Sequence, residues 1–234
     1  MTQSLRMILI GPPGAGKGTQ ARLLTEKHNV VAISAGDLFR ARVKDPNDPL
    51  GNEIKQILDA GKLVPDEITI RMIAERLEQP DCKNGFILDG FPRSVAQAEA
   101  LEEMLDKKGI KLDAVVQMEV DDDKLVERIS GRFTCGACGE GYHDKFKPPH
   151  DPASCDSCGK HDTFTRRSDD NAETVRSRLD TYHSQTAPIL PFYERLGKLK
   201  TVDGMADMAA VTAQIEAVLC PGKGCDKPQP PKMG

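Results

Sequence analysis

The sequence predicts an α/β fold in which helices flank a five-stranded parallel sheet. Five short apolar runs alternate with helical patterns along the chain. The first run, Met7–Ile10, passes directly into a glycine-rich turn, and a segment of good helix formers follows from Gln20. Near-continuous apolar strands that alternate with helices are typical of a parallel sheet covered on both faces.

The expected elements follow this alternation from one end of the chain to the other. Short apolar runs predict strands at Arg6–Ile10, Val30–Ile33, Phe86–Asp89, Ala114–Val120 and Leu199–Asp203. Helical patterns lie at Gly16–His28, Asp66–Gln79, Ser94–Lys107, Asp122–Ser130, Ala172–His183 and Met208–Leu219. Such sheets bind ligands at the carboxyl ends of their strands. Functional residues are therefore expected just after Ile10 and at Asp89.

Two segments break the alternation and are expected to form lobes over the site. Residues 34–64 carry two short helices around a proline-containing turn, and residues 132–169 are rich in glycine, cysteine, proline and polar residues. We therefore expect a core made of residues 1–33, 65–131 and 170–220. Residues 221–234 include seven prolines or glycines and are expected to form a flexible tail.

Composition limits the classes of function. The 234 residues are 38% hydrophobic and 29% charged, which is typical of a soluble globular chain. The net charge of −4 argues against general nucleic-acid binding, and no apolar run approaches the ~20 residues that span a membrane. A strand expected from Arg6 leaves no room for a secretory leader. We expect a cytoplasmic protein without nucleic-acid or membrane partners.

The glycine-rich turn has the pattern of a phosphate-binding loop. Its glycines allow backbone N–H groups to face an anion, and the start of the following helix adds partial positive charge. Lys17 can reach the β- and γ-phosphates, and the Thr19 hydroxyl can lie near a bound Mg²⁺. The binding residues expected here are Gly14, Ala15, Gly16, Lys17, Gly18 and Thr19. A chance glycine-rich turn is the alternative.

A second motif follows the strand at Phe86–Asp89. In phosphate-loop proteins an aspartate at the end of such a strand approaches the Mg²⁺ shell, which is the role expected of Asp89. Gly90 allows the backbone to approach a ligand, and Arg93 can hold a phosphate through two hydrogen bonds. A helix cap or turn residue is the alternative for Asp89.

Two Cys-x-x-Cys pairs within residues 132–169 predict a metal site. Sixteen residues separate the pairs, which are Cys135 with Cys138 and Cys155 with Cys158. Four thiolates suit Zn²⁺ and form a closed tetrahedral site, so a structural role is expected. Iron or cobalt, replacement of one cysteine by His143, two disulfides, and free thiols are the alternatives. Cys82 is expected to be a surface or half-buried thiol. Cys220 and Cys225 are expected to be incidental thiols, with a metal site or a redox pair as the alternatives.

With these motifs in order, the chain resembles the adenylate kinase family of nucleoside monophosphate kinases over about residues 6 to 219. The resemblance rests on the phosphate loop and on the runs Ser34-Ala35-Gly36-Asp37, Asp89-Gly90-Phe91-Pro92-Arg93 and Arg167-Ser168-Asp169-Asp170. It implies a monomer with a nucleoside-monophosphate lobe at 34–64 and a lid at 132–169. The implied reaction is the reversible, Mg²⁺-dependent conversion of ATP and AMP into two ADP.

The resemblance also implies roles for individual residues. Phosphoryl transfer needs fixed cations around two nucleotides, and arginine supplies them because it stays charged and donates through two groups. The implied AMP ligands are Ala35, Arg40, Lys62, Leu63, Val64, Gly90, Phe91, Pro92, Arg93, Gln97, Arg167 and Arg178. Arg128, Arg132, Arg167 and Arg178 would surround the triphosphate of ATP and the transferred group, which Lys17 would follow. Gly141, Tyr142 and the backbone near Ala206 would contact ATP, and Asp169 and Asp170 would hold the lid.

One position departs from the family pattern. Most adenylate kinases have threonine where this chain has Ala35, and alanine there resembles the UMP/CMP kinases. Gln97 and the long metal-bearing lid match the adenylate type, so AMP is the expected acceptor and UMP or CMP the alternative. A third possibility is a zinc-ribbon nucleotide switch that binds nucleic acid, although the lid has little basic clustering. Arg22 matches no family position and is expected to be structural.

Overall fold

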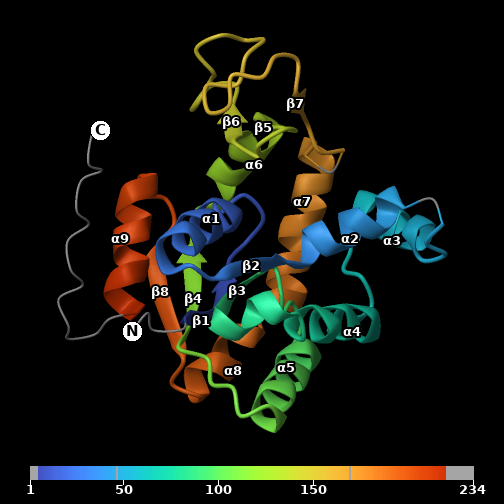
Figure 1. Ribbon diagram of the computed structural model, residues 1–234, viewed down its shortest axis with the longest axis vertical. Helices are drawn as coiled ribbons and strands as arrows, with labels where there is room; N and C mark the ends of the chain where they lie inside the picture. Colours follow the sequence, from blue (N-terminus) through green and yellow to red (C-terminus); the bar gives the residue numbers. More distant parts are fainter. Residues whose placement is uncertain (1–4, 46, 169, 220–234) are drawn as a thin grey trace.

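The computed structural model describes residues 5–45, 47–168 and 170–219 (Figure 1). The expected tail at 221–234, Cys220, Cys225 and Asp169 lie outside the described residues. The remainder forms a core built on one sheet and two lobes that project from it. Among the described helices, none combines the length and the apolar character needed to cross a bilayer.

The central sheet has five strands, and every pairing in it is parallel, as the sequence predicts. Its strands are β1 (Leu5–Ile10), β2 (Val31–Ser34), β3 (Gly85–Asp89), β4 (Ala114–Glu119) and β8 (Leu199–Asp203). They are ordered β2-β3-β1-β4-β8, so β1 lies in the middle. Leu9 of β1 pairs with Asp89 of β3. The turn after β1 and the carboxylate at the end of β3 therefore meet at one edge of the sheet.

Helices cover both faces of the sheet, and the alternation of β1 divides the apolar core between them. Met7 and Leu9 pack in a cluster with residues of α1 (Lys17–His28) and α9 (Met208–Leu219). Ile8 and Ile10 belong to a larger cluster on the other face. That cluster includes residues of α4 (Asp66–Leu77), α5 (Val95–Lys107) and α8 (Ile189–Arg195), with a short 3₁₀ turn at Pro80–Asn84 joining α4 to β3.

The sequence did not predict α8. Helix α7 (Ala172–Thr181) continues into a π-helical turn at Tyr182–Thr186, and α8 begins after Pro188. Proline is well tolerated at the start of a helix because the N–H groups of the first turn have no intrahelical partner, so the N–H that proline lacks is not needed there. Buried Ile189 and Tyr193 fix α8 against the sheet. The helix is short and its burial depends on tertiary contacts, so its local pattern is weak.

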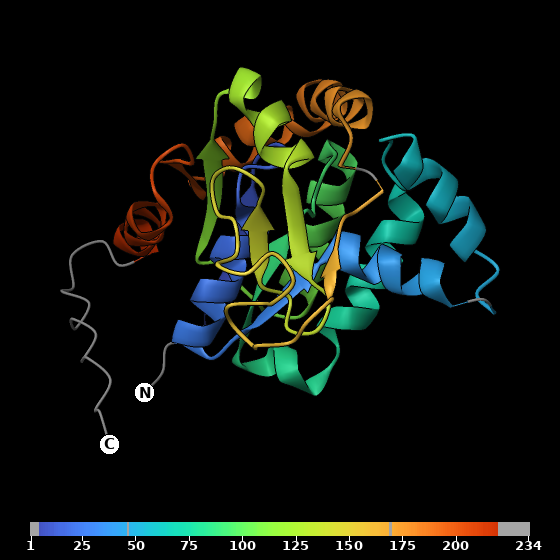
Figure 2. The same ribbon diagram turned by 90° about the horizontal axis from the view of Figure 1, so that it is seen from above.

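Two lobes project from the core. The first contains α2 (Ala35–Lys44) and α3 (Gly51–Asp59), which pack on each other. Ser34 caps α2, because its hydroxyl accepts a hydrogen bond from the Asp37 N–H at 3.2 Å. The second follows α6 (Asp122–Ser130) and holds the antiparallel strands β5 (Arg132–Cys135), β6 (Gly141–His143) and β7 (Phe164–Thr165). Seen from above, this second lobe lies over the core (Figure 2).

Candidate active site

A cleft of about 310 Å³ lies where the core meets both lobes. The loop after β1 forms its floor, and Asp89 ends the neighbouring strand. Arginines from the core and from both lobes face it. Its lining includes Gly14, Gly16, Lys17, Gly18, Thr19, Arg22, Asp37, Arg40, Asp89, Arg93, Arg132, Gly141, Arg167 and Arg178. Most of the residues predicted to contact phosphates are thus brought together.

The loop conformation requires glycine at two positions. Gly14 and Gly16 have φ values of 81° and 90°, in the left-handed region that side chains disfavour. A Cβ at Gly14 would also lie 2.5 Å from Ile129 of α6. Gly16 immediately precedes α1, so the free N–H groups at the start of that helix open toward the cleft. This geometry suits an anion.

Lys17 closes over its own loop. Its ammonium donates to the carbonyl oxygens of Gly11 and Pro12 at 2.8 and 2.9 Å. Burial lowers the pKa of Lys17 to about 8, and the positive charges of Arg93, Arg178 and Arg132 act in the same direction, whereas Asp89 opposes them. The surroundings of Lys17 are thus strongly positive, as a site for several phosphates requires.

Asp89 and Thr19 offer oxygen atoms to a hard cation. Both line the cleft, and a Cβ added at Gly18 would lie 3.4 Å from Asp89 Oδ2. The residue that separates Lys17 from Thr19 therefore faces the carboxylate and leaves room beside it. A carboxylate and a hydroxyl are ligand types that Mg²⁺ accepts alongside phosphate oxygens and water, so these residues fit the predicted cation.

Five of the six predicted arginines converge on the cleft, and four of them, Arg40, Arg93, Arg132 and Arg178, have acidic or backbone partners there. Arg132 donates to both oxygens of Asp170, at 2.6 and 2.9 Å, and Arg178 lies 3.6 Å from the same carboxylate. Asp170 is only 8% exposed, so this group is largely desolvated. The sixth, Arg128, does not line the cleft: its Nη1 lies 3.7 Å from Met205 Sδ.

Arg40 and Arg167 show how crowded the positive charges are. Burial of Arg167, with Arg40 and Arg132 nearby, lowers its pKa below the ordinary value. Burial opposes ionisation of Asp37, but its hydrogen bonds with Arg40, the shorter 2.6 Å long, lower the Asp37 pKa overall. An anion bound among these arginines relieves their mutual repulsion.

A smaller pocket beside the cleft gathers several of the predicted AMP ligands, among them Gln97, which is predicted to bond the base. Lys62, Leu63, Val64, Gly90, Arg93 and Gln97 line it, together with Phe39, Leu58 and Thr69, which the sequence analysis missed. Phe91 is 1% exposed and belongs to the apolar core beside this motif, while Pro92 lines a neighbouring cavity. Ala35 is 1% exposed and packs in the same core.

Two residues predicted to contact ATP, Tyr142 and Ala206, do not line the cleft. Tyr142 is 3% exposed, and its hydroxyl lies 3.3 Å from Cys155 Sγ and accepts from the Asp156 N–H at 2.8 Å. It therefore belongs to the interior of the second lobe, although its neighbour Gly141 lines the cleft. Ala206 packs against the apolar cluster of α1 and α9, outside the cleft lining.

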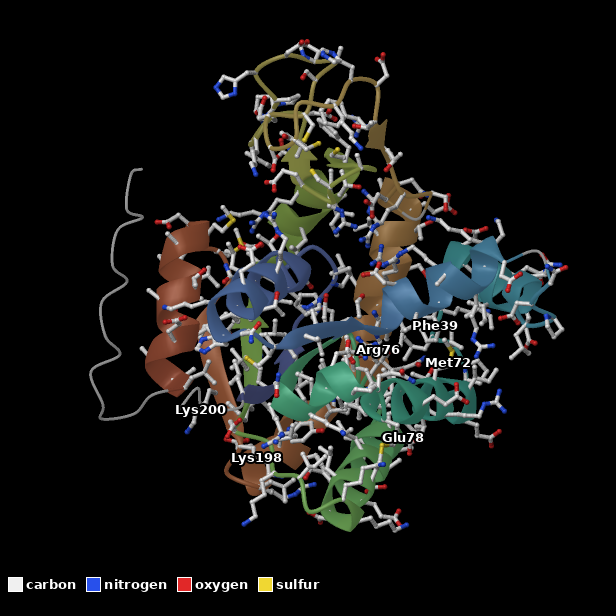
Figure 3. All side chains as sticks on the ribbon, viewed as in Figure 1. Phe39, Met72, Arg76, Glu78, Lys198 and Lys200 are labelled. Carbon is white, nitrogen blue, oxygen red and sulfur yellow. The ribbon has the colours of Figure 1, made fainter. Side chains whose placement is uncertain are left out.

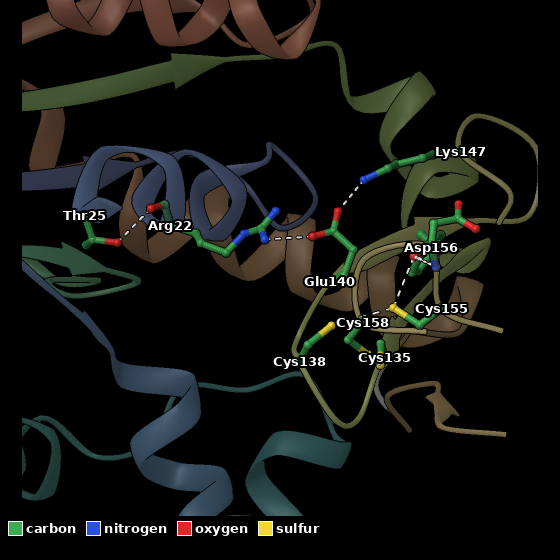
Figure 4. A network of polar contacts seen from close by, with 10 residues as sticks. Arg22, Thr25, Cys135, Cys138, Glu140, Lys147, Cys155, Asp156 and Cys158 are labelled. Atoms are coloured by element: carbon green, nitrogen blue, oxygen red, sulfur yellow. Dashed lines mark hydrogen bonds and ion pairs between the residues drawn. The ribbon is translucent and has the colours of Figure 1, made fainter. Parts of the chain in front are cut away.

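The four cysteines of the second lobe form one compact cluster (Figure 4). Their sulfur atoms all lie within 4.8 Å of one another, close enough to hold a zinc ion. All four are free cysteines, and the sulfur atoms of Cys135 and Cys158 and of Cys138 and Cys155 are 3.7 and 3.6 Å apart, far from a bond of about 2.05 Å. Soft thiolates arranged in this way fit Zn²⁺. The Thr163 hydroxyl lowers the pKa of Cys135 to about 6, whereas burial and the other three thiols raise the pKa of Cys158 to about 12.

His143 does not join the cluster. Its Nδ1 accepts hydrogen bonds from the N–H groups of Lys145 and Phe146 at 2.9 and 3.1 Å, and its Nε2 lies 3.2 Å from the Glu127 carbonyl oxygen. Both ring nitrogens are thus engaged at the base of the lobe. The alternative in which His143 replaces a cysteine ligand is not supported by this geometry.

Comparison with known proteins gives one consistent family. The family model described as adenylate kinase matches residues 9–198. Curated proteins named adenylate kinase from Rhizobium etli and Paramagnetospirillum magneticum are 52% and 53% identical over 215 residues, which cover 92% of this chain and 99% and 98% of the relatives. A third, from Novosphingobium aromaticivorans, is 52% identical over 92% of this chain and 99% of its own length.

Proposed function

This chain belongs to the adenylate kinase family, and we propose that it transfers the terminal phosphoryl group of ATP to AMP, reversibly, to give two ADP. The observation that carries the proposal is the cleft itself. A phosphate loop forms its floor, and arginines from the core and both lobes surround it. One nucleotide does not need so many fixed cations, whereas two nucleotides with their phosphates end to end do.

In this mechanism the protein positions and neutralises charge. The loop N–H groups and Lys17 bind the donor phosphates, and Lys17 moves from the Gly11 and Pro12 carbonyl oxygens to the transferred group. Arg40 and Arg93 hold the acceptor phosphate, while Arg132, Arg167 and Arg178 neutralise the charge that develops during transfer. Closure of the lid over the cleft excludes water, which would otherwise compete as acceptor.

Two metals support the activity in different ways. Thr19 and Asp89 would hold Mg²⁺ with the donor nucleotide, and the cation would neutralise phosphate charge when bound. The four cysteines would hold a structural zinc ion in the lid, a lobe whose apolar cluster consists of little more than Cys135, Tyr142, Cys155, Phe133 and Phe164. Metal binding supplies folding free energy that such a small core lacks.

AMP is the acceptor that the pocket around Gln97 favours. Gln97 carries a hydrogen-bonding amide for a base edge, and apolar Phe39, Leu63 and Val64 line the same pocket. Ala35 offers no hydroxyl, but the loss of one neutral hydrogen bond costs about 0.5–1.5 kcal/mol, which weakens selectivity without reversing it. The monomeric state and the cytoplasmic location remain predictions from the sequence.

The first experiment is a transfer assay with Mg-ATP and AMP, UMP, CMP or GMP, on purified protein that retains its metal. We expect a strong preference for AMP. Arg167→Ala should lower kcat/KM at least tenfold, by about 1.4 kcal/mol or more of transition-state stabilisation. Arg71→Ala, an exposed arginine of α4 outside the cleft, is the matched control.

Three outcomes contradict the proposal to different degrees. Preference for UMP or CMP would mean that Ala35 predicts the acceptor nucleotide correctly and that Gln97 does not. Slow hydrolysis without transfer to any monophosphate would favour a nucleotide switch. An equal loss of activity in Arg167→Ala and Arg71→Ala would remove the cleft arginines from the mechanism.

A further inference from the structure

The amide of Gln97 is held by two partners of opposite character. Its Oε1 accepts a hydrogen bond from the backbone N–H of Arg93 at 2.8 Å. Its Nε2 donates to Asp66 Oδ1 at 2.6 Å, across from α5 to the start of α4. Gln97 is 2% exposed, so water does not compete for these positions. The two ends of the amide are therefore fixed in one orientation.

Inversion of this amide is chemically disfavoured. A half-turn would place the Gln97 carbonyl oxygen against the Asp66 carboxylate, and its NH₂ group against the Arg93 N–H. The first contact would join two acceptors and the second would join two donors. Because Asp66 can only accept when ionised, it forbids the inverted amide more strongly than any neutral side chain would.

Asp66 is itself held in place. Its second oxygen, Oδ2, accepts a hydrogen bond from the Ser94 hydroxyl at 2.8 Å. The same hydroxyl accepts from the Gln97 N–H at 3.1 Å and caps α5. Asp66 lies in the first turn of α4, and Ser94 caps the start of α5. Their hydrogen bond therefore connects the two helices beside the acceptor pocket.

After these bonds the amide retains one N–H and one carbonyl lone pair, and Gln97 lines the acceptor pocket. A fixed donor beside a fixed acceptor suits a base edge with an amino group next to an unprotonated ring nitrogen. Adenine has that edge. Hypoxanthine has the reverse, a carbonyl oxygen next to a ring N–H, although the purine is the same size.

We propose that Asp66 is a positioning residue that sets acceptor selectivity, because it locks the Gln97 amide in the orientation that accepts AMP and rejects inosine monophosphate (IMP). The inference rests on the proposed function of the cleft and adds a residue that does not itself touch the substrate. It explains why an acidic side chain is placed against a base-reading amide.

The test compares AMP with IMP as acceptors and uses two substitutions of Asp66. Asp66→Ala frees one end of the amide, so the ratio of kcat/KM for AMP to that for IMP should fall about tenfold, mainly through a higher KM for AMP. Asp66→Asn keeps the shape, but its own amide can present either end to Gln97, so its ratio should lie between the wild type and Asp66→Ala.

Glu67→Ala is the matched control. Glu67 is an exposed acid in the same first turn of α4, so its removal also costs the helix start a favourable charge, and it does not line the acceptor pocket. The AMP/IMP ratio should not change in this variant. Calorimetric titration of folded protein with AMP or IMP alone provides a second readout that does not depend on turnover.

The outcomes separate this inference from the proposed function. If wild-type protein does not phosphorylate AMP, the function fails. If it does, and Asp66→Ala lowers AMP and IMP activity equally, Asp66 is merely structural and the inference is overturned. An unchanged ratio in both Asp66 variants overturns it as well.

Discussion

Arg22 of α1 and Glu140 of the β5–β6 turn form an ion pair, with Arg22 Nη1 2.7 Å from Glu140 Oε2 (Figure 4). The other oxygen of Glu140 faces Lys147 of the same lobe. Burial opposes ionisation of Glu140, but its hydrogen bonds with Lys147 and Arg22 lower its pKa below the ordinary value. The ion pair therefore connects the lid to α1, the core helix that begins just after the phosphate loop. From the sequence, Arg22 was expected only to be structural.

The first prediction concerns this contact. Arg22→Ala should cost less than ~1 kcal/mol in global stability, because the Arg22 side chain is 41% exposed. Amide hydrogen exchange in residues 136–141 should nevertheless become faster, since the lid loses its anchor on α1. Lys147→Ala is the control, because it leaves the Arg22 contact intact. Unchanged exchange in residues 136–141 would count against the anchor.

The second prediction is a pH dependence set by Lys17. The pKa of Lys17 is about 8 in the folded protein, so kcat/KM for ATP should decline above that pH as the ammonium is lost. Bound triphosphate stabilises the ammonium, so kcat should decline only at higher pH. Rate profiles from about pH 6 to 10 measure both limbs. Two profiles that decline together would exclude Lys17 as the titrating group.

The third prediction follows from the same pKa through stability. The folded pKa of about 8 lies below the unfolded value of 10.5, so the unfolded chain binds more protons between these values. The contribution of Lys17 to the free energy of unfolding must therefore rise with pH across that window. Lys17→Met lacks this contribution. The stability gained by Lys17→Met over wild type should be largest below pH ~8 and shrink toward pH ~10, in urea unfolding at each pH.

The fourth prediction concerns the cysteine cluster. Cys158→Ser should remove the metal, because the cluster loses one of its four thiolates at an exposed position. Cys82→Ser, a cysteine of the core far from the cluster in sequence, should retain it. Elemental analysis measures the content. In the metal-free protein, residues 133–165 should lose exchange protection while β1 keeps it; simultaneous loss in both would mean that the metal is not specific to the lid.

The fifth prediction tests the carboxylate between the arginines. Asp170→Ala should cost about 3 kcal/mol of stability, because Arg132 and Arg178 lose a buried counter-charge. The KM for ATP should rise as well, since Arg132 is no longer held at the cleft. Asp180→Ala, at an exposed position of α7, should stay within about 0.5 kcal/mol. Equal losses in the two variants would contradict the role of Asp170.

Much of the fold could be predicted because its signals are local. The strands are short apolar runs, and Gly14 and Gly16 mark a backbone conformation that side chains disfavour. The cysteine spacing likewise predicts a cluster that the structure forms. These features depend on a few neighbouring residues, so a single sequence contains them.

The remainder depends on contacts between distant residues. Asp66 reads in the sequence as an ordinary helix start, and only the fold brings it 2.6 Å from Gln97. Tyr142 lies next to a cleft residue, but its side chain points inward to Cys155, because it packs in the small apolar cluster of the lobe. Thr186, whose hydroxyl donates to the Arg93 carbonyl oxygen at 2.9 Å, lies in a π-helical turn that gave no local signal.

The ion pairs outside the site could not be predicted from the sequence. Residues at the outer ends of the core, such as Glu78, Lys198 and Lys200, point away from the site (Figure 3). Lys198 pairs with Glu102 and Lys108 with Glu78, over a long sequence separation in each case. Because the partners lie far apart along the chain, such pairs leave no pattern in the sequence.

The bond between Arg132 and Asp170 has an architectural consequence. These residues stand at the two ends of the lid, 38 positions apart, and their side chains meet at 2.6 Å. The chain thus leaves the core and returns to it at one place, where these two side chains join the ends of the lid. An insertion or deletion between the two ends changes the length of a closed loop and leaves α6 and α7 where they are. We therefore expect that the length of the lid can change without altering the phosphate loop that forms the floor of the cleft.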